Sequence, residues 1–507
     1  MKSASLFEIV AARCWNVLNE GKTFTPVFVL AVFAIALAGG LDFAAYCGAA
    51  ALLLPLGVIF YVYDYPLHLR WFLLPPLAAF LLLWGVFPVG LFVWAVLLYL
   101  FFTVFFWGTL YYHLRIGTTW WNFTRIWKLF LINSDSTSGN PGEQLPKTLL
   151  LLAAFAWGYD GLTGATDEAW SGWGSFFGAT GPWLGYCAFA AALFVYSWAA
   201  HRLLFTWKPV ESQTPTPEQP PLAAPARRVV VLVIDGCRKE RFEQADAPFL
   251  HRLMREGVYY DRMETVYPAR TVVCFSSMFT GANPREHGIR SNMVWKLGVR
   301  VESIFDSLRK QGRKGILFGC AHLIDAFGDD VASFTAVEKN SVVDIKIIEE
   351  AKRIMKRERP DLMVVQLIAV DQTGHSRGVL YPEYAAQISQ SDELIRGFCE
   401  WMEEEGLAEE TTYIVMADHG QGNGIGGHGH LDVGERFVPF VMYGHGVRSG
   451  VRVGEPNSIV SVAPTIAHLL GAPVPSGSRG RVLTEALDTR QSGASAASWQ
   501  PGAENNQ

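Results

Sequence analysis

The chain has 507 residues, enough for more than one domain, and a formal net charge of −5. Charged residues make up 18% of it, below the ~25% of ordinary soluble chains, and the deficit falls in the first two hundred positions. This balance, without a basic run, argues against a protein that binds nucleic acid polymers, and it indicates a membrane domain in the amino-terminal part.

Several apolar segments in this part have the length of membrane-spanning helices. Residues 71–112 carry no charge and suffice for two spans of ~20 residues, broken near Phe87–Gly90. Five or six spans are predicted in all. The segment Thr148–Tyr159 decides between these numbers, because its twelve residues also suit an interfacial or re-entrant helix. The other spans are predicted at Phe24–Leu41, Phe43–Tyr63 and Ser171–Ala200.

The flanking segments set the expected domain boundaries. The first twenty residues contain charges and no cleavage site, which favours an amphipathic helix over a removed signal peptide. After the last span, eighteen residues contain six prolines and are expected to form a semi-rigid spacer. The predicted parts are a membrane domain at 1–208, a linker at 209–226, a catalytic domain at 227–488 and a disordered tail at 489–507.

From Arg227 onward, short apolar runs alternate with amphipathic helical stretches, which predicts a three-layer α/β/α fold around a largely parallel sheet. Three predicted strands each end at an aspartate. "RRVVVLVIDG" ends at Asp235, "DLMVVQLIAVD" at Asp371 and "TTYIVMADHG" at Asp418. A lone aspartate after a strand is usually a cap or turn residue, but three at the carboxyl ends of parallel strands suit a binding site.

Histidines accompany these aspartates. "DQTGH" is read as a glycine-containing turn between Asp371 and His375, and His419 follows Asp418 directly. The set holds carboxylate and imidazole ligands without a thiolate, as in catalytic Zn²⁺ or Mn²⁺ sites, and it suffices for two metals and phosphoryl transfer. Its members are Asp235, Asp371, His375, Asp418, His419, His428 and His430.

Five motifs occur in order: "VVVLVIDGCR", "YPARTVVCFSSMFTG", "NPREHGIRSN", "DQTGH" and "ADHG…GGHG". Together they resemble the type I phosphodiesterase/nucleotide pyrophosphatase branch of the alkaline phosphatase superfamily, over about Arg227–Leu487. The resemblance implies two Zn²⁺ ions, with Mn²⁺ as the alternative. It assigns to the first metal Asp371, His375 and His428, with His430 as the substitute for His428. It assigns to the second metal Asp235, Asp418, His419 and the nucleophile.

The stretch Tyr267–Gly281 offers several hydroxyls and a thiol, and the resemblance places the nucleophile at Thr271. The residues agree, because Thr271 is expected at the amino-terminal end of a helix, where backbone N–H groups favour a phosphate. The other candidates lie further along this helix and are expected to be buried: Cys274, Ser276, Ser277 and Thr280. The resemblance also implies that Asn292 donates a hydrogen bond to a phosphate oxygen. A sulfatase would require Cys/Ser-x-Pro-x-Arg at the nucleophile. The stretch "TVVCF" lacks this proline and arginine, so sulfate-ester hydrolysis is not expected.

These features predict a membrane-anchored phosphodiesterase or phosphatase with a covalent phospho-threonine intermediate, acting on a lipidic or membrane-proximal phosphoester. A phosphoethanolamine-type headgroup transferase with the same intermediate is the first alternative, because the motifs do not say whether water or an alcohol attacks second. An inactive binding or scaffold module is an alternative of another class. Membrane lipids and the phosphoester are the expected partners, and the oligomeric state stays open.

The charge distribution leaves the side of the catalytic domain open. Basic residues gather at the amino terminus, in the 112–147 loop and after the last span. With six spans and a cytoplasmic amino terminus, all these clusters and the catalytic domain are cytoplasmic, whereas with five spans the catalytic domain is outside. The resemblance favours the extracytoplasmic side.

Overall fold

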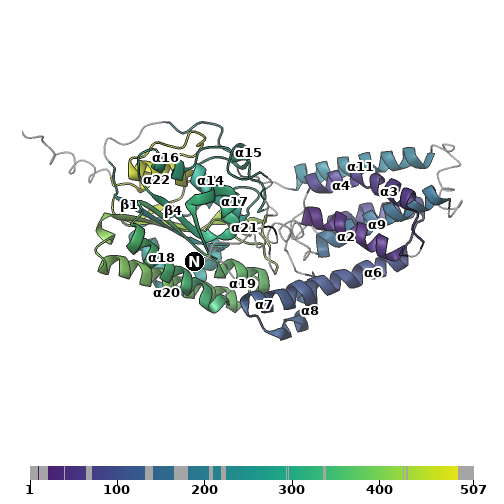
Figure 1. Cartoon of the computed structure of the whole chain (residues 1–507), viewed down its shortest axis with the longest axis horizontal. Coiled ribbons are helices and arrows are strands. Elements are labelled where there is room, and N and C mark those ends of the chain that lie inside the picture. Colours follow the sequence, from purple (N-terminus) through teal and green to yellow (C-terminus); the bar gives the residue numbers. More distant parts are fainter. Residues whose placement is uncertain are drawn as a thin grey trace, which may run out of the picture. The chain divides into compact units, whose positions relative to one another are not determined.

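The computed structural model describes residues 10, 21–38, 40–63, 71–131, 141–164, 181–204, 209, 211–217, 224–292, 294, 296–334, 339–425, 427–429 and 432–488. Contacts divide the chain into two compact units (Figure 1): residues 2–208 with the loop 423–431, and residues 209–422 with 432–507. We call them the helical unit and the α/β unit. The helix predicted for the first twenty residues, apart from Val10, and the predicted disordered tail lie outside the described residues.

Every regular element described in the helical unit is a helix. Within the described part of the chain, three helices are long and apolar enough to cross a membrane, at Phe43–Val62, Val89–Leu114 and Trp183–Leu203. Shorter apolar helices cover Thr25–Ile35 and Trp71–Trp84. The elements are α2 (Gly21–Ala36), α3 (Phe43–Leu52), α4 (Leu54–Val62), α5 (Leu74–Trp84), α6 (Val89–Leu100), the π-helix η2 (Phe101–Tyr111), α7 (Tyr112–Ile116), η3 (Trp120–Arg125), α8 (Ile126–Leu131), α9 (Pro141–Thr163) and α11 (Gly181–Leu203).

Helix α9 is longer and more central than the predicted twelve-residue segment. It spans 23 residues and packs against α2, α3, α5 and α6. Its residues 150–159 are all buried. Gly158 lets α3 approach closely, since a Cβ atom there would come within 2.6 Å of Leu52 Cδ1. The structure therefore places Thr148–Tyr159 inside the helical unit and not on its surface.

The α/β unit is built on a mixed eight-stranded sheet with the order β10-β2-β9-β7-β1-β6-β4-β5. Only β9 runs antiparallel to its neighbours β7 and β2, so the prediction of a largely parallel sheet is confirmed. The strands are β1 (Arg228–Ile234), β2 (Val258–Tyr260), β4 (Gly315–Cys320), β5 (Val331–Phe334), β6 (Leu362–Leu367), β7 (Thr411–Met416), β9 (Phe440–Gly444) and β10 (Val451–Val453). A small sheet joins β11 (Asn457–Ser458), β3 (Met263–Glu264) and β8 (Phe437–Val438).

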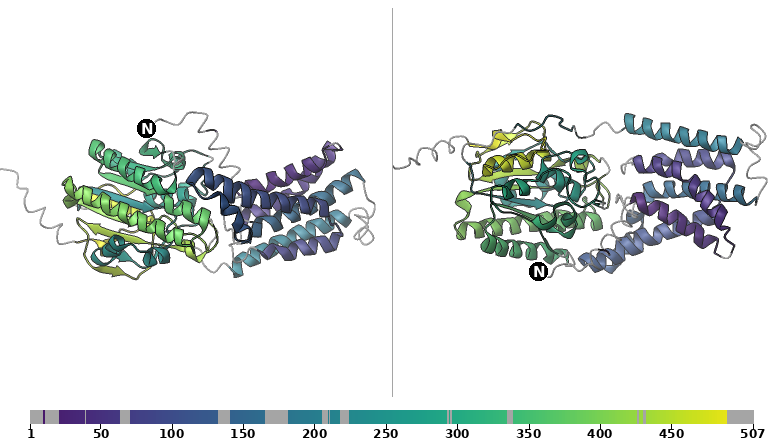
Figure 2. Two further views of the ribbon diagram at one scale, coloured as in Figure 1. Left: turned by 90° about the horizontal axis from the view of Figure 1, so that it is seen from below. Right: turned by 45° about the horizontal axis from the view of Figure 1, so that its top comes forward.

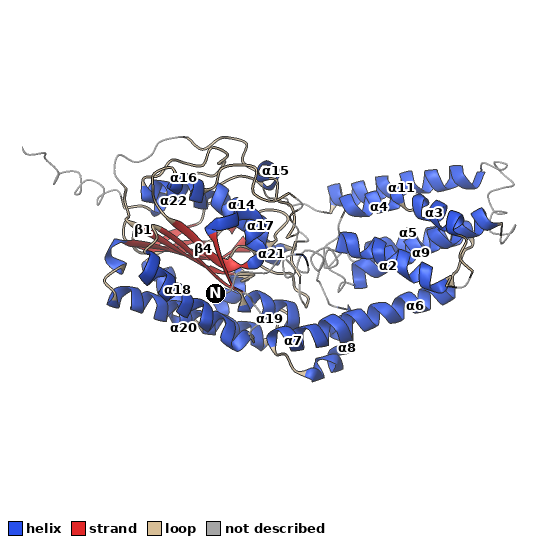
Figure 3. Cartoon of the chain, viewed as in Figure 1, coloured by secondary structure: helices blue, strands red, loops and turns tan. Residues whose placement is uncertain are grey.

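Helices cover both faces of the large sheet, so the unit has three layers (Figure 3). The two long helices α18 and α20, green in Figure 2, lie side by side on one face, and α14, α16 and α22 pack together on the other. Strand β1 is buried at all seven positions, as expected for an apolar strand covered on both sides. The helices are α12 (Lys239–Gln244), α13 (Pro248–Glu256), α14 (Thr271–Thr280), α15 (Pro284–His287), α16 (Ile304–Arg309), α17 (Ile324–Phe327), α18 (Asn340–Glu358), α19 (Ala369–Arg377), α20 (Pro382–Glu404), α21 (Val433–Arg436) and α22 (Val462–Leu470).

Part of the linker predicted as a semi-rigid spacer packs on the α/β unit. Thr216 is buried and its hydroxyl lies 2.7 Å from Ser478 Oγ, while its backbone N–H donates to the Ser478 carbonyl. The carbonyl of Ser212 accepts a hydrogen bond from Asn283 Nδ2. The prolines of this segment have no backbone N–H to donate. Its other residues still have hydrogen-bond donors and acceptors that can bind a folded surface.

A buried histidine joins helix α14 to the loop that follows α15. His287 Nε2 lies 2.9 Å from Ser277 Oγ, and His287 Nδ1 accepts the Ile289 N–H at 3.2 Å. An accepting Nδ1 requires the neutral ring. Burial lowers the pKa of His287 from its ordinary value of 6.5 to about 3. The fold therefore holds this imidazole uncharged.

We expect His287 to make the α/β unit sensitive to acid. Between its ordinary pKa and about 3, the unfolded chain binds one proton more than the folded chain. The free energy of unfolding should therefore decrease as the pH is lowered through this window, by up to about 1.4 kcal/mol per pH unit. Thermal unfolding of the full chain between about pH 7 and 4.5 should show a shallower loss for His287→Gln than for the unmodified protein. Equal slopes would contradict this assignment.

Candidate metal centre and nucleophile

Parallel pairing brings two of the predicted aspartates to one edge of the sheet. Strand β1 lies between β6 and β7 and runs parallel to both. Asp235 directly follows β1, and Asp418 comes two residues after the end of β7. Both side chains are buried, and the backbone N–H of Gly236 donates to Asp418 Oδ1 at 3.1 Å. The two carboxylates therefore belong to one buried site.

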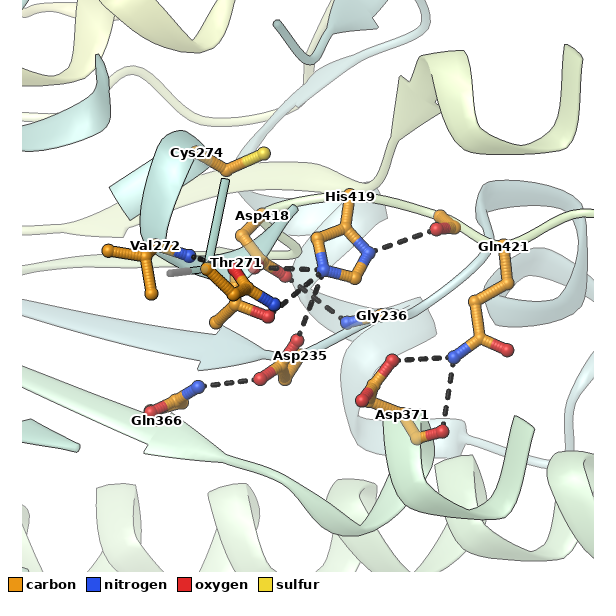
Figure 4. A network of polar contacts seen from close by, with 12 residues as sticks. Asp235, Gly236, Thr271, Val272, Cys274, Gln366, Asp371, Asp418, His419 and Gln421 are labelled. Carbon is orange, nitrogen blue, oxygen red and sulfur yellow. Dashed lines mark hydrogen bonds and ion pairs between the residues drawn. The ribbon is translucent and has the colours of Figure 1, made fainter. Parts of the chain in front are cut away.

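His419 forms the centre of this site (Figure 4). Its Nε2 atom lies 3.3 Å from Thr271 Oγ1, 3.5 Å from Asp235 Oδ1 and 3.4 Å from Asp418 Oδ2. Its Nδ1 atom lies 3.0 Å from the Gly420 carbonyl oxygen, which can only accept a hydrogen bond. Nδ1 must then carry a ring proton, so Nε2, which faces the three oxygens, is the ring atom available to bind a metal ion.

The donor atoms around His419 fit a divalent metal ion. A tetrahedral ion with bonds of about 2.0–2.1 Å separates its ligands by about 3.3 Å, close to the distances from His419 Nε2. Asp235 Oδ1 and Asp418 Oδ2 are buried and accept no hydrogen bond from the residues that the structure describes. Oxygen and imidazole donors without a thiolate suit Zn²⁺ or Mn²⁺.

The electrostatics of the site also favour a bound cation. Burial raises the pKa of Asp235 well above its ordinary value, and the charges of Asp418 and Asp371 raise it further. Burial also raises the pKa of Asp418. Buried carboxylates that repel one another are stabilised by a nearby cation, which favours their charged forms.

Asp371 and His375 lie on a helix, so the predicted strand end and glycine turn are wrong. Strand β6 ends at Leu367, and both residues belong to α19. The buried carboxylate of Asp344 accepts the N–H of Ile368 at 2.9 Å and so starts this helix. Residues four apart share one helix face, and His375 Nε2 lies 3.3 Å from Asp371 Oδ2.

The potential metal ligands form two groups, in each of which one ligand atom per residue lies within 4.8 Å of the others. One group is Asp371, His375 and His428, and the other is Asp235, Asp371 and His419. Asp371 is common to both. The structure thus brings together every predicted ligand that it describes, whereas the alternative His430 lies outside the described residues.

Thr271 is the first residue of helix α14, as predicted, and 8% of it is exposed. The rival side chains of this helix have structural partners. Ser276 and Thr280 donate to backbone carbonyls one turn earlier, and Cys274 Sγ lies 3.3 Å from Thr265 Oγ1. Thr271, by contrast, faces the metal-ligand cluster, since its Oγ1 atom lies 3.3 Å from His419 Nε2.

Asn292 borders the same helix end. Its Oδ1 atom accepts the backbone N–H of Val272 at 3.0 Å. Because this bond fixes which end of the amide is the acceptor, the NH₂ group remains as a donor next to Thr271. This arrangement suits the predicted contact with a phosphate oxygen.

Sequence reasoning missed three residues that support the ligands. Gln366 Nε2 donates to Asp235 Oδ2 at 2.5 Å, and Gln421 Nε2 donates to Asp371 Oδ1 at 2.6 Å. Gly236 has φ +64°, and a Cβ atom there would come within 2.5 Å of Asp371 Oδ1. A signal existed for Gln366, which is the one polar residue of the buried strand β6.

We expect Gln366 to tune metal binding. Its Oε1 atom accepts the Cys320 N–H at 2.8 Å, which turns Nε2 toward Asp235. Gln366→Met keeps most of the side-chain volume but releases Asp235, so zinc affinity should fall about 10–100-fold. Competition with a chelating dye measures this, and Gln387→Met on α20 is the control for loss of a buried glutamine. Equal zinc affinities of the two variants would contradict the role of Gln366.

Comparisons with known proteins give matches to part of this chain. Residues 229–314 and 320–449 match the family model described as type I phosphodiesterase / nucleotide pyrophosphatase. The chain is 28% identical over 287 residues to the catalytic subunit of GPI ethanolamine phosphate transferase 3 from Mus musculus, covering 51% of this chain and 25% of that protein. It is 23% identical over 214 residues to venom phosphodiesterase from Macrovipera lebetinus, covering 38% and 25%.

The matched part therefore spans about a quarter of the length of these relatives. Among solved structures, the murine ectonucleotide pyrophosphatase / phosphodiesterase 5 is similar at 15% identity, with a TM-score of 0.42. The alignment covers 49% of this chain and 96% of that one.

Proposed function

We infer that the protein is a metal-dependent enzyme that breaks phosphoester bonds. Its residues 229–314 and 320–449 match the type I phosphodiesterase/nucleotide pyrophosphatase family. One observation carries the proposal: a threonine hydroxyl at a helix amino terminus lies 3.3 Å from a histidine nitrogen that also borders two buried carboxylates. This combination suits nucleophilic attack on phosphorus.

We propose Zn²⁺ as the resident ion, with Mn²⁺ as the alternative. Asp235, Asp418 and His419 would hold one ion next to Thr271. Asp371, His375 and His428 would hold a second. When bound, the ions lower the pKa of a coordinated hydroxyl or water and offset the charge of phosphate oxygens.

The side chains divide the work of two half-reactions. Thr271 Oγ1 loses its proton and bonds to phosphorus, while the bond to the first alcohol breaks and that alcohol leaves with a proton. Water or a second alcohol then attacks phosphorus, and the bond to Thr271 Oγ1 breaks and restores its hydroxyl. Asn292, fixed by Val272, donates to a non-bridging oxygen, and the positive end of the α14 dipole favours the same negative charge.

The second attacking group separates two candidate functions. Attack by water makes the protein a phosphodiesterase or phosphatase, and attack by an alcohol makes it a phosphoethanolamine-type headgroup transferase. The match to a GPI ethanolamine phosphate transferase over 51% of this chain favours considering the transferase. Three helices of membrane-spanning length support a lipidic or membrane-proximal phosphoester as the substrate of either reaction.

Turnover and product analysis of the full chain test these proposals. The protein purified in detergent should contain metal and should cleave a p-nitrophenyl phosphodiester. With added alcohol, a transferase should give a new diester and a hydrolase a free monoester. A metal-free, inactive protein would support the scaffold alternative and would overturn the enzyme proposal.

A membrane topology follows from the helices of the helical unit. We propose that α2 and α5 cross the membrane in addition to the three long apolar helices, giving five spans, and that α9 adds a sixth if it crosses too. An odd number puts the α/β unit on the side opposite the amino terminus. We favour the extracytoplasmic side, and protease accessibility of the linker in intact cells tests it.

A further inference from the structure

A group of exposed basic and apolar side chains stands next to the proposed site. Arg290, Lys296 and Arg300 are exposed, and Leu297 is 57% exposed. We call these four residues the basic patch. The sequence from 288 to 301 contains these three basic residues and no acidic one, so the segment carries a formal charge of +3.

The backbone around the basic patch is held in place. Arg300 N–H donates to the His287 carbonyl at 3.0 Å, and Gly298 N–H donates to the Asp325 carbonyl at 2.8 Å. Between Arg290 and Lys296, the side chain of Asn292 bonds to the start of helix α14. The patch is thus attached to the same helix end that carries Thr271.

The cations of the patch differ from the basic residues that follow them in the chain. Arg309, Lys310 and Arg313 each form an ion pair with a carboxylate. Among the residues that the structure describes, Arg290, Lys296 and Arg300 form none. Three cations without a counter-charge among the described residues create a local positive potential that attracts an anionic partner.

The exposed leucine narrows the chemistry of that partner. A soluble anion would be bound by the cations alone, and Leu297 would remain in water. The headgroup layer of a bilayer offers both phosphates and, just beneath them, apolar surface. Two further exposed apolar side chains stand on segments next to the predicted ligands, Leu380 after α19 and Val433 in α21, with 56% and 65% exposed.

We propose that the basic patch docks on the anionic headgroup layer of a bilayer. Arg290, Lys296 and Arg300 contact lipid phosphates, and Leu297 enters the layer between them. Helices long and apolar enough to cross a membrane belong to the same chain, so a bilayer is available to the patch. Docking itself does not depend on catalysis. Its consequence, delivery of headgroup phosphates to Thr271, rests on the proposed function.

Photo-cross-linking at Leu297 tests the docking. The full chain with Leu297→p-benzoylphenylalanine is placed in nanodiscs of phosphatidylcholine alone or with about 30% phosphatidylglycerol. Cross-links to lipid should be roughly tenfold more abundant with the anionic lipid and should decrease in about 0.5 M salt. The triple variant Arg290→Gln, Lys296→Gln and Arg300→Gln should lose this increase.

A matched triple variant removes the same charge elsewhere on the α/β unit. Arg255→Gln, Arg262→Gln and Arg448→Gln change exposed residues and should keep the full increase. The proposal would be overturned if the cross-link yield were the same with and without anionic lipid, or if Leu297→p-benzoylphenylalanine cross-linked to protein in place of lipid. Because the readout is a cross-link, an inactive chain that still cross-links to anionic lipid would refute the proposed function alone.

Discussion

The variant Thr271→Ala is expected to lose phosphodiester turnover by about a thousandfold or more. The hydroxyl is the atom that lies 3.3 Å from His419 Nε2, and the rest of helix α14 offers no second hydroxyl at that place. Alanine favours a helix, so the fold should be retained. Turnover of a p-nitrophenyl phosphodiester by the full chain, with thermal unfolding as the check on folding, measures the effect.

Two variants serve as controls for this result. Thr271→Ser retains a hydroxyl and should keep substantial activity. Ser276→Ala alters a buried hydroxyl of the same helix that donates to the Val272 carbonyl at 2.7 Å, so it should lower stability slightly and leave turnover nearly unchanged. Full activity of Thr271→Ala would refute the nucleophile, and equal losses in both alanine variants would indicate a structural cause.

Removal of metal is expected to abolish turnover and to lower the thermal stability of the α/β unit. Burial and the neighbouring carboxylates raise the pKa of Asp235, so folding without a cation leaves unfavourable charge in the site. An ion present at a thousandfold excess over its Kd stabilises the folded state by about 4 kcal/mol. Thermal unfolding after chelation and dialysis, followed by titration with Zn²⁺ or Mn²⁺, should show loss and recovery in parallel with activity.

The variant Asp235→Asn tests the origin of that stability change. Asparagine removes one of the buried negative charges, so the metal-free variant should be at least as stable as the metal-free unmodified chain. Its melting temperature should also respond much less to added Zn²⁺. If chelation leaves the melting temperature of the unmodified chain unchanged, the metal centre proposed here does not exist.

Much of the α/β unit could be predicted from local patterns. Apolar runs bounded by turn residues gave strands β1, β6 and β7, and an amphipathic repeat gave the long helix α20. The start of a helix at Thr271 followed from Pro268 and the apolar run after it. These features depend on residues close together in the chain, where periodicity and turn chemistry act directly.

Other features depend on partners distant in sequence. Asp371 and His375 appeared to flank a turn, because a glycine stands between them; Asp344, 24 residues before Ile368, starts the helix instead. The linker contact of Thr216 depends on Ser478, which is 262 residues away. The sequence of one segment does not show such distant partners. An aspartate on the apolar face of α18, Asp344, is nevertheless a hint that its carboxylate binds another element.

The sequence by itself determined the kinds of residue available to the site: carboxylates that follow buried strands, histidines nearby and a threonine at the start of a helix. It also determined the division into an apolar amino-terminal part and an α/β part. Only the tertiary structure decided which atoms meet. Parallel pairing of β1 with β6 and β7 fixes where the carboxylates converge, and Gln366, Gln421 and Gly236 fix how the acids are oriented. The reason is physical: a site requires distances near 3 Å between groups far apart in the chain, and only packing of the whole sheet and its helices sets these distances.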